Sequence, residues 1–193
     1  MDEPILAKPG AGLPFVESLY LRWYLGPFVS RKADKATNLR HFTLLSSRVL
    51  KEANGVPEGK RDHKVLVPTM RGIEDSSRHW SANEVLEHLM IVGTAMRGLI
   101  EDLAAGRTSD FVVRIADVKP KGKYKGGDAR PDFTDFINET ARRLEPLDIV
   151  DGGVEHEHPW FGGFNALQWT WLLAGHSGIH LNQLVAIKKG LPR

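Results

Sequence analysis

The sequence predicts an all-α protein, a four-helix bundle, and three observations support this fold class. Four segments of bundle length repeat apolar residues at three- and four-residue intervals, the period of an amphipathic helix. Two of them begin with the residues of a capping box, and little of the chain alternates like a strand. One connection is far longer than a helix hairpin needs, so we expect a crossover between the second and third bundle helices.

Residues 1–34 are predicted to form an N-terminal arm and a short helix, ahead of a single bundle domain over 35–193. Residues 1–14 are rich in Pro and Gly, and we expect a loosely packed arm without chemistry. A short helix over 14–28 places Leu19 and Trp23 on its apolar stripe and ends at Gly26-Pro27.

The first bundle helix is predicted over about 36–53, where "NGVPEG" ends it, and residues 55–80 form an ordered connection. The second begins at Ser81, because Glu84 three residues later completes a capping box, and runs to about 105. Residues 106–131, which include the apolar run "DFVVRI", form the crossover.

The third bundle helix is predicted from Asp132 or Thr134 to about Leu147, and Pro146 indicates that it can end earlier. The fourth begins after Asn165, with Gln168 three residues on, and continues to about Lys189, before Gly190 and Pro192.

Composition restricts the function. The chain has 193 residues, 41% of them hydrophobic, and a formal charge of +2, which favours neither nucleic acid nor a membrane as partner. It has no cysteine, so a metal must be held by His, Asp or Glu. We see no signal peptide pattern and no apolar stretch of about 18 residues, so we expect a soluble cytoplasmic protein.

The last helix carries two histidines at positions that a heptad assigns to the core, His176 and His180. A buried imidazole without a partner costs roughly 1–3 kcal/mol, so each needs a hydrogen bond, a metal ion or a polar pocket. Their spacing of four residues lets both reach one ion, although hydrogen-bonded core histidines remain the alternative. Gly175 and Gly178 are unusual inside a helix, and we expect them to make space beside the rings.

His88 is the candidate for a third ligand. At about 1.5 Å per residue it lies roughly 10 Å from the start of its helix, and His180 lies roughly 13 Å from the end of the last one. The two histidines therefore share a depth if the helices are antiparallel, and a parallel arrangement excludes the site.

These residues also resemble a known family. "HWSANEVLEHL" and, about ninety residues later, "HPWFGGFNALQWTWLLAGHSGIHLNQL" look like the DinB-like family, over most of residues 35–190. The resemblance implies an up-down-down-up bundle with a zinc or nickel site, one histidine from the second helix and two from the fourth: His88, His176 and His180. The small "SGI" between the last two histidines departs from the bulky or basic pair usual in the family, which leaves the shape of the pocket and the substrate open.

The other candidate residues have plainer interpretations beside the functional ones. Glu84 is a possible base or partner of a ligand, but its capping role explains it, and Gln183 either binds a ligand or water or is a polar core residue. His156 and His158 have the look of a second metal motif, but their spacing of two on a loop without other ligands favours solvated turn residues. The lysines at 119–125, in the 119–130 stretch of the crossover, could bind phosphate or nucleic acid, but we expect them to be merely solvated. The aromatic residues near the start of the last helix are expected in the core: Phe164, Trp169 and Trp171.

Two hypotheses follow. In the first, the protein is a metal-dependent hydrolase or thiol transferase, in which metal-bound water or a small thiol co-substrate attacks a small-molecule substrate. In the second, it is a non-catalytic stress-related or interaction bundle with structural or hydrogen-bonded core histidines, and either form can associate as a homodimer.

Overall fold

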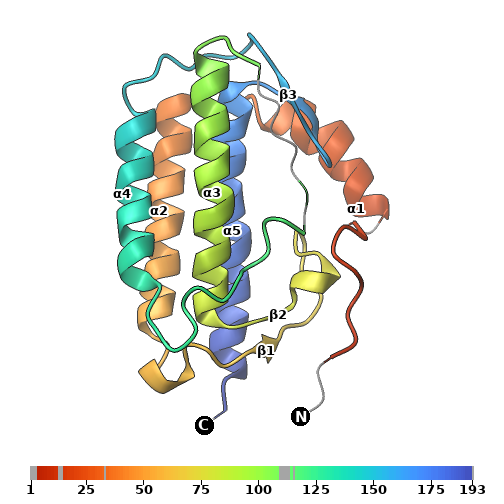
Figure 1. The fold of residues 1–193 in the computed structure, drawn as a ribbon. Helices are drawn as coiled ribbons and strands as arrows, with labels where there is room; N and C mark the ends of the chain where they lie inside the picture. Colours follow the sequence, from red (N-terminus) through yellow and green to blue (C-terminus); the bar gives the residue numbers. More distant parts are fainter. Residues whose placement is uncertain (1–3, 13–14, 33, 109–113, 115, 193) are drawn as a thin grey trace.

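Four long helices pack against one another in the computed structural model, which describes residues 4–12, 15–32, 34–108, 114 and 116–192 (Figure 1). They are α2 (Lys35–Asn54), α3 (Ala82–Ala104), α4 (Arg130–Leu144) and α5 (Ala166–Gly190). Helix α5 contacts both α2 and α3, and α4 completes the bundle by contacting the same two helices. The all-α class predicted from the sequence is confirmed. No helix in the described ranges is long and apolar enough to cross a membrane.

The helix ends follow their capping residues. Both predicted capping boxes are present, because Ser81 and Asn165 each accept a bond from the backbone of the residue three positions on, whose side chain bonds back. Helix α4 ends at Leu144, so the earlier of the two ends that Pro146 allowed is the observed one. The buried aromatic and aliphatic side chains form one core between the helices, with Phe42, Phe133, Phe164 and Trp169 among the largest.

The N-terminal helix differs from the prediction. It consists of α1 (Phe15–Tyr20) and the π-helical η1 (Leu21–Val29), so Gly26-Pro27 does not end it. The wide π-helical turns carry the chain past these residues, and the carbonyl of Gly26 accepts a hydrogen bond from Gln168 at the start of α5. Leu19 and Trp23 are exposed, at 42% and 68%, so the predicted stripe is not the packed face.

The N-terminal arm is held in place, contrary to the expected loose packing. The carboxylate of Glu74 accepts hydrogen bonds from the backbone amides of Gly10 and Gly12, and Asp75 accepts one from Ala7. These bonds are between the arm and the 55–80 connection, which is ordered as predicted. The connection contains the short helices η2 (Glu58–Lys60) and η3 (Asp75–Ser77) and the antiparallel strands β1 (Val65–Leu66) and β2 (His79–Trp80).

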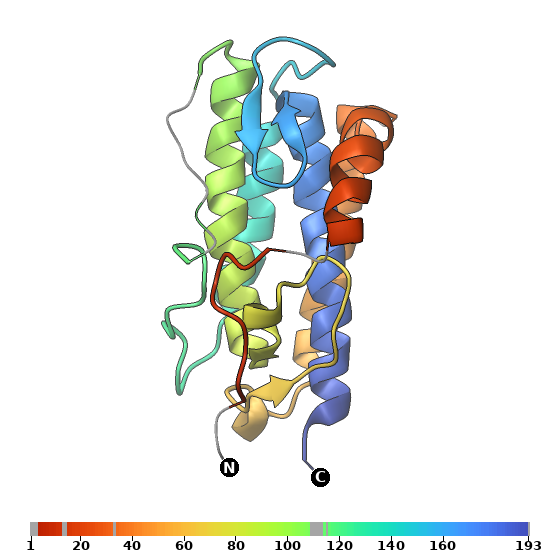
Figure 2. The ribbon, with the colours of Figure 1, turned by 90° about the vertical axis from the view of Figure 1, so that its right-hand side faces the viewer.

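A second hairpin precedes α5. Its strands β3 (His156–His158) and β4 (Gly162–Phe164) pair antiparallel, with His158 opposite Gly162. Figure 2 shows this hairpin and the N-terminal helix at the same end of the bundle, on the side where α3 and α5 face the viewer. The hairpin, η1, α3 and α5 together enclose the cavity described below.

Candidate metal centre

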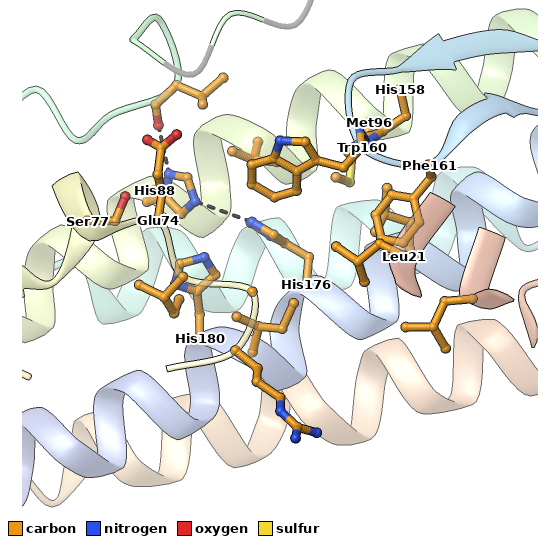
Figure 3. A pocket seen from close by; sticks show the side chains of 18 of the residues that line it. Leu21, Glu74, Ser77, His88, Met96, His158, Trp160, Phe161, His176 and His180 are labelled. Atoms are coloured by element: carbon orange, nitrogen blue, oxygen red, sulfur yellow. Dashed lines mark hydrogen bonds between the residues drawn. The ribbon is translucent and has the colours of Figure 1, made fainter. Parts of the chain in front are cut away.

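Three histidines from two helices converge on one point (Figure 3). His88 on α3 and His176 and His180 on α5 each offer a ring nitrogen, and these nitrogens all lie within 4.8 Å of one another. The ring centroids of His88 and His180 are 4.6 Å apart, which is the match in depth that the sequence required of them. His88 and His180 are buried, whereas His176 is half-buried.

The tautomer of His88 is fixed by the crossover. Its Nδ1 lies 2.7 Å from the backbone carbonyl oxygen of Val118. Because a carbonyl only accepts, Nδ1 carries the proton and Nε2 keeps its lone pair. A backbone carbonyl on the far nitrogen of a ligand histidine is a common way to orient it toward a metal.

The crossover is itself anchored to α3. The buried carboxylate of Glu87 accepts hydrogen bonds from the backbone amides of Lys121, Gly122 and Lys123, at 2.9–3.2 Å. The sequence indicated that the lysine segment is merely solvated, and this prediction is wrong. The backbone of the segment is bonded to Glu87, the residue that precedes His88. Residues 109–113 and 115, which include most of the "DFVVRI" run, lie outside the described residues.

Gln183 orients His180 in the same way. Its Nε2 donates to the backbone carbonyl of Ser77 at 2.7 Å, which fixes the amide so that Oε1 faces the Nδ1 of His180, also at 2.7 Å. His180 then carries its proton on Nδ1 and keeps a lone pair on Nε2. Gln183, one of the two residues left open by the sequence, is fully buried and is a positioning residue for His180.

The separation of two ring nitrogens fits a tetrahedral metal site. The Nε2 atoms of His88 and His176 lie 3.3 Å apart. Two nitrogen ligands at about 2.0–2.1 Å from a zinc ion, with a tetrahedral angle between them, are separated by about 3.3 Å. The three histidines can therefore hold a metal ion without a large change in the positions of these two rings.

Burial keeps the imidazoles neutral. Desolvation lowers the pKa of His88 to about 4, and the same cause holds the pKa values of His176 and His180 well below their usual range. Trp80 contributes to this environment, since its ring stacks on that of His180 with centroids 5.9 Å apart. Neutral imidazoles are the form that binds a metal ion.

Two further predictions concern residues around the triad. Glu84 has one carboxylate oxygen on the backbone amide of Ser81 and the other paired with Lys64 at 2.8 Å, and it does not line the cavity, so its contacts are those of a helix cap. Gly178 does not make space beside the rings: a Cβ there would lie 3.5 Å from Leu45 of α2, on the other side of α5.

The triad opens onto a cavity of about 710 Å³, within the usual range for small-molecule sites. The cavity is lined mainly by apolar side chains, but it also includes Glu74 and His158, neither of which the sequence placed near the triad. His158 is half-buried and burial lowers its pKa to about 3, so the prediction of a solvated turn residue is wrong. Its place in a short hairpin, packed on Trp169 with ring centroids 5.4 Å apart, has no signature in the sequence.

The other residues near the start of α5 do not add to the site. His156 is half-buried and does not line the cavity. Trp169 and Phe164 are in the core, as predicted, and Trp171 is half-buried against the core.

No protein family model, curated protein or solved structure matches the chain. The geometry of the site and the chemistry of its residues are therefore the basis for its function.

Proposed function

We propose that the protein is a metal-dependent enzyme of the DinB-like type, with one divalent ion, zinc or nickel, held by His88, His176 and His180. The observation that carries the proposal is the cluster of three ring nitrogens within 4.8 Å at the wall of a cavity of about 710 Å³. Catalytic zinc sites characteristically have three protein ligands and a fourth position for a reactant. A cavity beside the triad gives a substrate access to that position.

The reaction class that fits is hydrolysis or transfer of a thiol to a small molecule. A divalent ion at the triad supplies Lewis-acid catalysis. The chain's own residues orient the ligands, through Gln183 and the carbonyl of Val118, and Trp80 covers the site with an apolar ring. Because the chain has no cysteine, a thiol enters this proposal only as a co-substrate.

The family assignment includes a helix order, up-down-down-up, with a crossover after the second bundle helix. The crossover supports this order, because residues 105–129 between α3 and α4 are enough to connect two parallel helices. The chemistry proposed for the triad does not depend on the family name. A homodimer remains a prediction, for which the exposed aromatic side chains of the N-terminal helix offer an apolar face: Tyr20, Trp23, Tyr24 and Phe28.

One observation favours the alternative, a non-catalytic bundle. The Nε2 atoms of His88 and His176 are within hydrogen-bond distance of each other, and the Nδ1 atoms of His88 and His180 have protein partners. Each of the three histidines thus has a hydrogen-bond partner within the protein, as a polar core residue needs. The two functions differ in whether a metal ion binds and in whether that ion is accessible to small molecules.

Metal analysis of the tag-free protein tests the proposal. We expect one zinc or nickel ion per chain, no stoichiometric metal in His88→Ala, and zinc affinity about 10- to 100-fold lower in Gln183→Leu. Ser177→Ala is the matched control, because this buried residue of α5 bonds to Ser46 and not to a histidine. No stoichiometric uptake of zinc, nickel or manganese by the unaltered protein would exclude a metalloenzyme. In the cobalt-substituted protein, a visible spectrum that does not respond to azide or to a small thiol would instead favour a structural ion.

A further inference from the structure

The cavity extends along the bundle beyond the three histidines. On α3 it is lined by Val92 and Met96, one and two turns after His88, and on α5 by Leu172, one turn before His176. Leu21 and Leu25 of η1 also line it. An apolar channel therefore leads from the triad toward the β3–β4 hairpin.

A histidine lines the other end of this channel. The backbone amide of Trp160 donates to the Nδ1 of His158 at 3.1 Å. Nδ1 is therefore the acceptor and, in the neutral ring, the proton is on Nε2. No described residue accepts a hydrogen bond from this Nε2–H, which leaves a donor with a fixed tautomer in the wall of an apolar cavity.

Trp169 gives a second indication of a missing acceptor at the same end. It lines the cavity, is 1% exposed, and packs against the ring of His158. Its Nε1–H is buried with no hydrogen-bond partner among the described residues. A buried donor of this kind normally has a partner, and here it lies next to the half-buried His158, whose Nε2–H has no acceptor among the described residues either.

The distance between the two ends follows from the helix. Trp169 precedes His176 by seven residues on α5, which corresponds to about 10 Å along the helix axis. At the triad end, Lys119 also lines the cavity, half-buried, with its ammonium 5.4 Å from the centroid of the Trp80 ring. Glu74 also lines the cavity near Lys119, but its carboxylate is bonded to the backbone amides of Gly10 and Gly12. The ammonium beside the metal ligands can therefore pair with a carboxylate at that end.

We propose that the cavity binds an elongated, mostly apolar carboxylate that carries a carbonyl oxygen about 10 Å from its carboxylate. The carboxylate lies at the triad beside Lys119, the apolar body lies against Val92 and Leu172, and the distant carbonyl accepts from the Nε2–H of His158. The contact of the carboxylate with a metal ion rests on the proposed function, whereas the apolar channel and His158 do not need the ion.

Calorimetric titration of the full chain with two probes tests this inference. Monomethyl sebacate has a carboxylate, an apolar chain and a distant ester carbonyl, and decanoate has the same carboxylate and a similar chain without the ester. We expect the zinc-loaded protein to bind the ester about 3- to 10-fold more tightly than decanoate, the effect of one neutral hydrogen bond. Equal affinities for the two probes, or no saturable binding of either, would overturn the inference.

Three variants test whether His158 causes the preference for the ester over decanoate. His158→Phe removes the donor and should abolish the preference, whereas His158→Gln retains a donor and should keep it. His156→Phe, in the same hairpin but outside the cavity lining, is the control and should also keep it. A preference that persists in His158→Phe would exclude this residue. If that variant does not fold, Ala95→Trp, which fills the channel from a half-buried position on α3, should weaken both probes at least 10-fold, and unchanged binding would exclude the channel.

The same titrations on metal-free protein separate this inference from the proposed function. If zinc does not bind but the ester preference and its dependence on His158 persist, the proposed function fails and the ligand class stands. If zinc binds stoichiometrically and the preference is absent, the ligand class alone fails.

Discussion

Polar side chains on the two buried faces of α5 differ in their partners. Toward α2, polar groups close on one another: Asn38 donates to the hydroxyl of Thr170 at 3.0 Å, and the hydroxyls of Ser46 and Ser177 are 3.1 Å apart. Toward α3, His176 and His180 meet His88 at the wall of a cavity. On the α2 face the polar side chains bond to one another across the helix contact. On the α3 face the histidine nitrogens are available to a ligand.

Two adjacent residues of α5, His176 and Ser177, lie on opposite faces. His176 borders the cavity and is half-buried, whereas the next residue, Ser177, is 3% exposed and bonds to α2. A helix that is apolar on nearly all sides is expected to be buried on more than one face, and α5 meets that expectation. Burial alone therefore does not identify a functional residue on this helix, and the partner that each polar group finds is the better guide.

The largest expected effect separates these two adjacent residues. His176→Ala should lower zinc affinity by more than about 100-fold, since it removes a ligand rather than a residue that orients one. Ser177→Ala should leave zinc affinity unchanged and lower the free energy of unfolding by about 1 kcal/mol, the usual net value of a hydrogen bond. Competition with a zinc chelator and urea denaturation measure the two quantities. Equal losses of zinc affinity in both variants would show that the two faces are not distinct.

A smaller effect should appear in the pH dependence of the metal-free protein. The pKa of His88 is lowered by burial to about 4, below the value of about 6.5 in an unfolded chain. Between these values the unfolded state binds more protons, so the stability present above pH 6.5 is lost as the pH falls toward 4. For His88 alone, the loss is on the order of 3 kcal/mol at pH 4.

Urea denaturation between pH 7 and pH 4 measures this loss, with two variants as references. Ser177→Ala, on the α2 face, should reproduce the pH dependence of the unaltered protein. His88→Phe should make it less steep, because one of the buried histidines with a lowered pKa is gone while His176 and His180 remain. A curve for His88→Phe as steep as that of the unaltered protein would show that His88 does not contribute to the pH dependence.

The features that the sequence predicted are those with a local signature. Apolar periodicity located the long helices, and the capping boxes at Ser81 and Asn165 located two of their starts. The helical depth of His88 and His180 correctly predicted that these residues come together. Each of these inferences used spacing within one helix or a comparison of two helix lengths.

The features that the sequence did not predict depend on tertiary contacts. His158 lies in a two-stranded hairpin whose place beside Trp169 is set by packing, and Glu87 is buried only because the crossover folds back onto it. The length of the N-terminal helix has a similar explanation. Gly26-Pro27 predicts a helix end, but a π-helical turn and the hydrogen bond from Gln168 continue the helix through these residues.

The smallest expected effect concerns the two glycines of α5. A Cβ on Gly175 would meet nothing within 4 Å, and one on Gly178 would make an ordinary contact with Leu45. Gly175→Ala and Gly178→Ala should therefore raise the free energy of unfolding by about 0.5–1 kcal/mol each, because alanine is favoured over glycine inside a helix. Zinc affinity should not change in either, since a Cβ on Gly178 packs on Leu45 of α2 and one on Gly175 has open space around it. A drop in zinc affinity with unchanged stability would show instead that the glycines make room for the histidines, which is the role expected from the sequence.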